Sequence, residues 1–280
     1  MNEIFTSARV SVAERLRQRY RGDVPDAAAV NETLDGLLAH RSVRAYLPDP
    51  LPAGTLEVLV AAAQSAASSS NLQVWSVVAV EDAERKARLA ALAGNQKHIL
   101  EAPLFLLWLV DLHRLTALGE ARGEPAGALD YLESFLLGAV DTSIAAQNAV
   151  VALESLGLGA VYTGGIRNRP AEVAAELGLP PHVFALFGLA VGHPDPARPA
   201  EVKPRLPQDA VLFKEQYEWG DRQRAGIAAY DERLRGFQRE QNLPERDWTE
   251  QAGTRVRGAG SLSGRDVLRD VLHHLGFALR

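Results

Sequence analysis

The stretch LESFLLGAVDTSIAAQNAVVALESL, residues 132–156, lies in a predicted helix that covers residues 128–156. Its apolar side chains fall on more than one face of the helix, which is typical of a helix at the centre of a hydrophobic core. Gly157 and Gly159 follow and end it, because glycine readily adopts the left-handed backbone conformation that closes helices. We therefore expect the fold to be built around this helix.

Four short segments rich in β-branched and other apolar residues predict strands buried on both faces, at residues 74–80, 103–110, 160–163 and 183–192. Apolar residues at helical spacing predict further helices at residues 55–67, 81–93 and 169–177. Residues 95–98 are expected to form a polar connector, and residues 112–127 a loop or a broken helix. Buried strands that alternate with helices predict an α/β or α+β sheet packed by helices.

The two ends of the chain differ from this central part. Residues 4–20 predict a helix with a moderately clear apolar face, and Asn31 is the expected N-cap of a helix that ends near residue 40. Residues 215–280 are mostly polar and helical, with loops at 242–244 and 258–264. We expect this region to be too polar for a core of its own, and therefore to wrap the main body or a partner subunit.

The composition restricts the possible chemistry. Hydrophobic residues make up 47 % and charged residues 23 % of the 280 residues, as in ordinary globular proteins. The net charge of −5 argues against a general nucleic-acid binder, so no nucleic-acid partner is expected. The sequence has no cysteine, which excludes disulfides, thiolate nucleophiles and iron–sulfur clusters. Any redox chemistry must therefore use a bound cofactor.

Several familiar motifs are absent from the sequence. No G-x-G-x-x-G follows a strand, no Walker A or G-x-S-x-G motif occurs, and the seven histidines lack metal-ligand spacing, so no metal site is expected. Residues 1–22 mix charges with apolar positions, unlike a signal peptide. The apolar run 102–110 is too short to span a bilayer. These features predict a cytoplasmic enzyme or binding protein without membrane association.

Residues 40–46, His40-Arg41-Ser42-Val43-Arg44-Ala45-Tyr46, predict an extended segment with the side chains to bind an anion. Alternate side chains share a face in an extended chain, so His40, Ser42 and Arg44 should lie on one side and Arg41 on the other. Guanidinium groups present forked donors that match phosphate. Taken alone, however, a cationic run is more often a solvated surface.

A second cationic stretch is Lys203-Pro204-Arg205. Proline keeps the local chain extended, so Lys203 and Arg205 should point the same way. Together with Arg41 and Arg44 they would surround a dianionic phosphate. On the tripeptide alone, a solvated proline-rich loop is the favoured interpretation.

Three polar stretches follow predicted helices or strands. Residues 68–73 offer hydroxyl and amide groups for a ring edge or a phosphate, although ordinary helix C-capping is the favoured interpretation of this stretch alone. In residues 94–97, Gln96 both donates and accepts, which suits a ring with adjacent carbonyl and N–H groups, whereas the alternative is a solvent loop. In residues 162–165, paired glycines either admit a ligand ring close to the backbone or simply form a turn.

Taken together, these stretches resemble the FMN-dependent nitroreductase family, and especially its NADPH-preferring, oxygen-insensitive nitroreductases and NADPH–flavin oxidoreductases. The resemblance starts near residue 34, extends to the C-terminus, and is carried in the same order by residues 40–44, 68–73, 94–98, 140–149, 154–159, 162–168 and 203–207. It implies an α+β fold: a mixed sheet flanked by helices, with a long central core helix and an extended helical C-terminal tail. It also implies a homodimer with two FMN sites at the subunit interface. The expected domains are an N-terminal helical extension (1–30), an FMN-binding core (31–214) and a C-terminal helical excursion (215–280).

The resemblance also implies roles for individual residues. The phosphate and ribityl end of FMN would be held by His40, Arg41, Ser42, Arg44, Lys203 and Arg205. The ribityl chain or the ring would contact Ser68, Ser70 and Gln96, and the ring would be lined by Tyr162, Gly164 and Gly165. In residues 236–248, Arg239 is the first candidate and Arg246 the second for the 2′-phosphate of NADPH.

The family works by a ping-pong reaction in which NADPH reduces FMN and leaves before a small-molecule electron acceptor binds. No side chain needs to act as acid or base, so no catalytic side chain is assigned. The main hypothesis is an FMN-dependent NAD(P)H oxidoreductase that reduces nitroaromatics, quinones or free flavin. The alternatives are a flavin-binding module without appreciable turnover, and an interaction protein that uses its polar tail as a docking arm.

Overall fold

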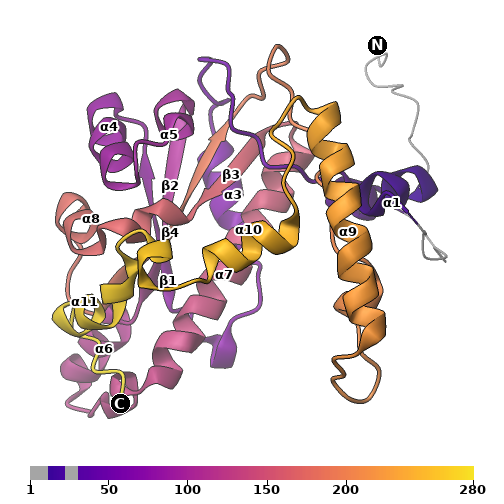
Figure 1. The fold of residues 1–280 in the computed structure, drawn as a ribbon. Helices are drawn as coiled ribbons and strands as arrows, with labels where there is room; N and C mark the ends of the chain where they lie inside the picture. The colour runs from indigo at the N-terminus through magenta and orange to yellow at the C-terminus, as the bar shows by residue number, and fades with distance from the viewer. Residues whose placement is uncertain (1–11, 23–30) are drawn as a thin grey trace. The chain divides into compact units, whose positions relative to one another are not determined.

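The computed structural model describes residues 12–22 and 31–280, and Figure 1 shows the fold. The described residues form two compact units. The larger unit comprises residues 42–200 and 262–280, and the smaller unit comprises the described residues up to Arg41 together with residues 201–261. The part of the predicted helix 4–20 that precedes Val12 lies outside the described residues.

A four-stranded sheet lies at the centre of the larger unit. The spatial order is β1-β2-β4-β3, and the strands are Trp75–Val80 (β1), Leu104–Asp111 (β2), Gly159–Thr163 (β3) and Val183–Gly192 (β4). All three strand pairings are antiparallel, with Val78 opposite Leu107 in the first of them. The prediction of a mixed sheet is therefore wrong for these four strands, and the one parallel pairing recorded among the described residues is an isolated bridge between Ser42 and Ala160. The four predicted strands are confirmed to within one residue at each end.

Helices cover both faces of this sheet (Figure 1). On one face lie α3 (Thr55–Gln64) and α7 (Leu132–Ser155), and on the other lie α4 (Ala83–Leu92), α5 (Lys97–Glu101) and α8 (Pro170–Leu177). Successive side chains of β2 point to opposite faces, so they divide between the two cores. Leu104, Leu106 and Trp108 pack with α3 and α7, whereas the opposite core contains Phe105, Leu107 and Leu109. The predicted α+β class is confirmed.

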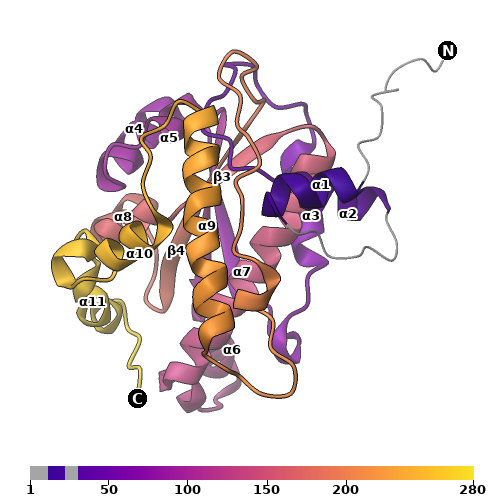
Figure 2. The same ribbon diagram turned by 45° about the vertical axis from the view of Figure 1, so that its right-hand side comes forward.

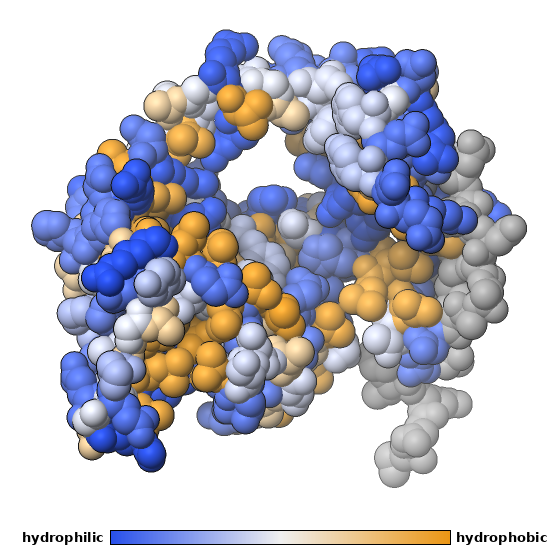
Figure 3. Space-filling model, turned by 90° about the horizontal axis from the view of Figure 1, so that it is seen from below, coloured by the Kyte–Doolittle hydropathy of each residue, from blue (hydrophilic) through white to orange (hydrophobic). Residues whose placement is uncertain are grey.

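The helix α7 has the central position that its sequence predicts. Its buried residues include Ala145, Ala149 and Leu153, which pack against the sheet. Within the described ranges, α7 is the one helix long and apolar enough to cross a membrane by length and composition alone, a criterion that core helices also meet. Apolar side chains also remain exposed on the surface, and Figure 3 shows one face on which such areas occur.

Three local predictions are wrong. The expected connector 95–98 is already helical from Lys97, where α5 begins. The expected loop or broken helix 112–127 contains a regular helix, α6 (His113–Arg122), which ends at Gly123 in the left-handed conformation. The long helix starts at Leu132 rather than at residue 128, because residues 127–130 form a 3-10 turn whose carbonyl at Ala128 accepts from the backbone N–H of Tyr131.

The C-terminal region contains α9 (Asp221–Glu240) and α10 (Trp248–Arg255) in the smaller unit, and α11 (Leu268–His274) in the larger one. The expectation that this region has no core is wrong for α9 and α10, which lie together in Figure 2. Their apolar cluster is formed by Tyr230, Leu234 and Phe237 together with Leu206 and Trp248. After α11, Phe277 is buried in an apolar cluster of the larger unit that also contains Phe184 and Leu272.

The smaller unit also contains α1 (Val12–Tyr20) and α2 (Glu32–Ala39). Asn31 caps α2 as predicted, since its side chain accepts from the backbone N–H of Leu34 at 3.0 Å. Arg15 on α1 forms an ion pair with Asp35 on α2, at 2.8 Å. The N-terminal helix is therefore tied to the helix that leads into the predicted anion-binding segment.

Candidate functional site

In the smaller unit, the start of the first predicted cationic stretch, His40-Arg41, is linked to the second stretch, Lys203-Pro204-Arg205. The guanidinium group of Arg19 on α1 donates to the carbonyl of His40 at 2.8 Å and to the carbonyl of Lys203 at 3.1 Å. The backbone N–H of Arg205 in turn donates to the carbonyl of Arg19 at 2.9 Å. The structure therefore joins His40 to Lys203, which lies 163 residues later in the sequence.

The second of these stretches is extended, as its proline predicts. Lys203 and Arg205 are exposed. Val202, which precedes them, and Pro204, which lies between them, are buried. The hydroxyl of Tyr230 on α9 donates to the carbonyl of Pro204 at 2.9 Å and holds the buried side in place. Alternation of exposed and buried side chains puts the two cations on one side of the segment, where they can act on one anion.

In the larger unit, residues 42–46 continue the first stretch along the edge of β3. The backbone N–H of Val43 donates to the carbonyl of Ala160 at 2.9 Å, and the buried hydroxyl of Tyr46 donates to the carbonyls of Val43 and Ala190. Val43 lies so close to Gly159 that a Cβ there would be 2.6 Å from its methyl group. This packing leaves Arg44 exposed beside a firmly held backbone.

The polar loop 68–73 is not a simple helix C-cap, since α3 already ends at Gln64. The hydroxyl of Ser68 donates to the carboxylate of Asp141 on α7 at 2.6 Å, and the backbone N–H of Ser69 donates to the same carboxylate at 3.2 Å. Ser70 has a positive φ of 49°, and so do two further residues of the loop. The buried Asp141 therefore holds a strained loop that presents the exposed Ser70.

The paired glycines after β3 meet the connector that contains Gln96. A Cβ on Gly165 would lie 2.4 Å from the carbonyl oxygen of Ala93 and 2.5 Å from the amide nitrogen of Gln96. The atoms that come close to the backbone of Gly165 are therefore those of Ala93 and Gln96 in the protein itself. The structure brings Gln96 and Gly165 together, which neither motif predicts when taken alone.

A buried histidine lies beside the same strand end. The Nε2 atom of His98 is 2.9 Å from the hydroxyl of Thr163, and both side chains are buried. Burial lowers the pKa of His98 below its ordinary value of 6.5, and the nearby charge of Arg44 lowers it further. His98 is consequently held in its neutral form near pH 7, and Arg44 lies within electrostatic range of it.

Tyr162 lies on the opposite side of β3 from its buried neighbours and is partly exposed. Its hydroxyl donates to the side-chain oxygen of Gln147 at 3.3 Å, and its ring meets Phe187 edge-on at 5.1 Å between centroids. These contacts fix a ring at the strand end that precedes the two glycines.

Sequence analysis missed two arginines that converge on Gly164. A Cβ on Gly164 would lie 3.4 Å from a terminal nitrogen of Arg167 and 3.8 Å from one of Arg265. Arg167 donates to the carbonyl of Leu186, and Arg265 donates to the side chain of Asn168 at 2.8 Å. Burial lowers the pKa of Arg167, and the charge of Arg265 lowers it further. Arg265 follows a loop of the polar tail, and no sequence signal distinguishes it from the other arginines there.

The two arginines expected at NADPH differ in their surroundings. Arg239 is exposed and forms a bidentate ion pair with Glu245, at 2.8 and 3.0 Å. Arg246 lines a hollow of about 200 Å³ in the smaller unit, together with Arg255 and with Glu250, Gln251 and Thr254. Arg246 is therefore the better placed of the two for an anionic group.

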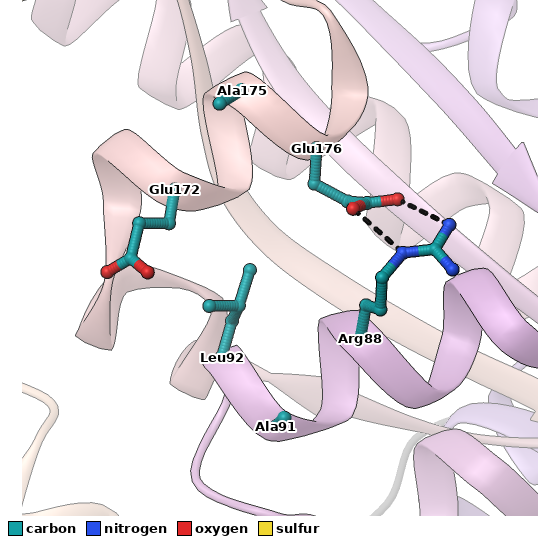
Figure 4. A pocket seen from close by; sticks show the side chains of 6 residues that line it. All are labelled: Arg88, Ala91, Leu92, Glu172, Ala175 and Glu176. Carbon is teal, nitrogen blue, oxygen red and sulfur yellow. Dashed lines mark hydrogen bonds and ion pairs between the residues drawn. The ribbon is translucent and has the colours of Figure 1, made fainter.

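A larger surface hollow of about 560 Å³ lies between α4 and α8 (Figure 4). Arg88 and Glu176 form a bidentate ion pair across it at 3.0 Å, and Arg85 also contacts Glu176 at 3.3 Å. None of the predicted site residues lines this hollow. Its charges neutralise one another, so we assign no function to it.

Comparison with known proteins gives a consistent result over most of the chain. Residues 37–193 match the model of the nitroreductase family, and residues 203–280 match the model of its C-terminal domain. The chain is 39 % identical over 252 residues to an FMN reductase (NADPH) of Bacillus subtilis, covering 89 % of this chain and 99 % of that protein. It is 38 % identical to an NADPH-flavin oxidoreductase of Vibrio harveyi, covering 82 % and 92 % of the two chains.

A solved structure agrees with these relatives. The hypothetical oxidoreductase YcnD from Bacillus subtilis superposes with a TM-score of 0.85 at 37 % identity, covering 90 % of this chain and all of that one. The predicted resemblance is thereby confirmed in sequence and in fold. The protein belongs to the nitroreductase family.

Proposed function

We propose that the protein is an FMN-dependent NADPH oxidoreductase that passes reducing equivalents to nitroaromatics, quinones or free flavin. The proposal rests on family membership and on relatives named FMN reductase (NADPH) and NADPH-flavin oxidoreductase. When bound, FMN supplies the hydride transfer, so the protein's residues need only bind and orient the reactants.

The observation that carries the proposal is the pairing of the two cationic stretches by Arg19 in the smaller unit. Lys203 and Arg205 lie exposed on one side of an extended segment, which is the donor chemistry that a phosphate requires. His40 and Arg41 belong to the same unit, and the family resemblance implies that they contact the phosphate and ribityl end, as do Ser42 and Arg44. The residues present therefore fit the phosphate end of FMN.

The ring end has fitting chemistry in the larger unit. Gln96 and Gly165 lie together, and Ser68 and Ser70 belong to a loop that Asp141 holds. Tyr162 is close to Gly164 and Gly165 in the sequence, and its ring is held by Gln147 and Phe187. Arg167 and Arg265 place positive charge beside Gly164. Cations near the ring would stabilise negative charge that develops there during reduction.

Arg246 would select NADPH through the 2′-phosphate. It lines a hollow with Arg255, whereas Arg239 is neutralised by Glu245. Replacing Arg246 by Ala should raise the KM for NADPH and leave the KM for NADH unchanged. Equal changes in both values would remove this assignment.

We further propose that the protein is a homodimer that works in the cytoplasm. Leu132, Leu136, Val140 and Ile144 recur every four residues along α7 and are between 38 % and 55 % exposed. A contiguous apolar stripe on a helix is typical of an interface between proteins. A second copy is its proposed occupant, as the family resemblance implies.

A visible spectrum of the purified protein, followed by titration with NADPH, tests the proposed function. We expect flavin absorption bands that bleach on NADPH addition and recover when a quinone is added. A colourless protein that fails to take up added FMN would contradict the proposal. Steady-state assays with a quinone separate the enzyme from a flavin-binding module, which would bind FMN without oxidising NADPH.

A further inference from the structure

We infer that Arg19, on the N-terminal helix α1, is a positioning residue that sets the geometry of the phosphate-binding cations. This inference rests on the proposed FMN site and deepens it. Residue 19 precedes the part of the chain that matches the nitroreductase family model, which begins at residue 37. The role therefore belongs to a segment of this chain that the family match does not include.

Arg19 connects both cationic stretches through backbone groups. One terminal nitrogen donates to the carbonyls of Leu38 and His40 at 2.9 and 2.8 Å, and the other donates to the carbonyl of Lys203 at 3.1 Å. The carbonyl of Arg19 accepts from the backbone N–H of Arg205 at 2.9 Å. A single residue thus fixes the backbone on both sides of the expected phosphate contacts.

The side chain of Arg19 is buried. Only 8 % of the residue is exposed, and burying a guanidinium group is costly unless its donors are satisfied. Its planar fork carries donors in fixed directions, so three carbonyl bonds define the relative position of the two backbones closely. Lysine has a single ammonium group on a flexible stem and cannot reproduce this geometry.

Contacts that do not involve Arg19 also hold α1 in the smaller unit. Arg21 forms an ion pair with Glu240 at 2.7 Å and lies 5.0 Å from the ring centroid of Phe237. The side chain of Gln208 donates to the hydroxyl of Tyr20 at 3.3 Å. Loss of the Arg19 side chain should therefore disturb the two cationic stretches more than the docking of α1.

The test compares FMN with riboflavin, which lacks the phosphate, in Arg19→Ala, Arg19→Lys and the control Arg17→Ala. Arg17 is exposed on the same helix and forms an ion pair within it, with Glu14 at 2.9 Å. Flavin-free full-length protein is titrated with each flavin by fluorescence. We expect Arg19→Ala to weaken FMN binding by roughly tenfold or more and riboflavin binding by less than about twofold. The absorption bands of the FMN that still binds should keep their positions.

Arg19→Lys keeps a buried cation, so it should lose less affinity for FMN than Arg19→Ala does, and the loss should again be absent for riboflavin. If Arg19→Ala does not fold, Arg19→Lys takes its place in the test. FMN affinity in both variants equal to that of Arg17→Ala would overturn the inference. Equal loss of FMN and riboflavin would also overturn it, because Arg19 would then only support the fold. A wild-type protein that binds neither flavin would instead remove the proposed function itself, and the inference with it.

Discussion

The hydroxyl of Ser68 donates a 2.6 Å hydrogen bond to the carboxylate of Asp141, which is 2 % exposed on the central helix α7. The same carboxylate accepts from the backbone N–H of Ser69. This pair ties a loop with a strained backbone to the central helix of the fold, and so connects the proposed ribityl contacts to the core.

Replacing Asp141 by Ala should lower the free energy of unfolding by about 2–4 kcal/mol, because two donors lose a charged acceptor inside the protein. Chemical denaturation measures this loss. Asp141→Asn keeps one acceptor oxygen and should lose less. Ser143→Ala, at an exposed position of the same helix, should stay within about 0.5 kcal/mol of the wild type. A harmless Asp141→Ala change would show that the loop does not depend on this carboxylate.

Replacing Gly165 by Ala should destabilise the protein by about 1–3 kcal/mol, because the new Cβ would overlap the carbonyl of Ala93 and the amide of Gln96. The matched control is Gly127→Ala, where the added Cβ meets open space. Thermal unfolding of both variants gives the comparison. Equal stability of the two would mean that the connector moves away from Gly165 at little cost.

The buried His98 should make stability depend on pH. Its pKa is lowered in the folded protein, so the unfolded chain binds the proton more tightly. The stability that neutral His98 contributes is complete above its ordinary value of 6.5 and is lost as the pH falls through that value toward the folded pKa. The wild type should therefore lose stability between about pH 7.5 and 5.5 relative to His98→Gln.

Denaturation of both proteins at several pH values tests this expectation. His113→Gln, at an exposed position, serves as the control and should keep the pH dependence of the wild type. Parallel curves for wild type and His98→Gln would show that this group does not titrate differently in the folded state.

Replacing Arg44 or Arg205 by Ala should weaken FMN binding by about 1.5–3 kcal/mol each, since a charge-assisted bond to the phosphate is lost. Equilibrium titration of the flavin-free protein measures the change. Arg122→Ala removes an exposed arginine that pairs with Glu124 and should leave FMN binding unaltered. Unchanged FMN affinity in both the Arg44→Ala and the Arg205→Ala variant would contradict the assignment of these two arginines to the phosphate.

Replacing Val140 by Glu should convert the proposed dimer to a monomer, because a charge in the middle of an apolar interface is buried without a partner. Sedimentation velocity distinguishes the two states. Leu118→Glu, an equally exposed position on α6, should not alter the mass. A wild-type protein that already sediments as a monomer would remove the dimer proposal.

Local spacing in the sequence was sufficient for the core elements. The four strands and the central helix follow from apolar runs and from periodicities of two and 3.6 residues, which determine the face on which each side chain lies. The shared direction of Lys203 and Arg205 was likewise predictable from the proline between them. The failures were local too: α5 is only five residues long and α6 buries none of its residues, so neither has an apolar stripe that periodicity could detect.

The relations between distant segments were decided only by the tertiary structure. Arg19 meets Lys203 across 184 residues, Ser68 meets Asp141 across 73, and Arg265 meets Asn168 across 97. The sequence contains many similar side chains, and the residues around each of these do not indicate which distant residue it contacts. A hydrogen bond requires the two atoms to lie within about 3 Å, so such partners meet only after strand pairing and helix packing have brought their backbones together. Sequence periodicity determines which face of an element a side chain is on, but it does not determine which distant segment lies next to that face.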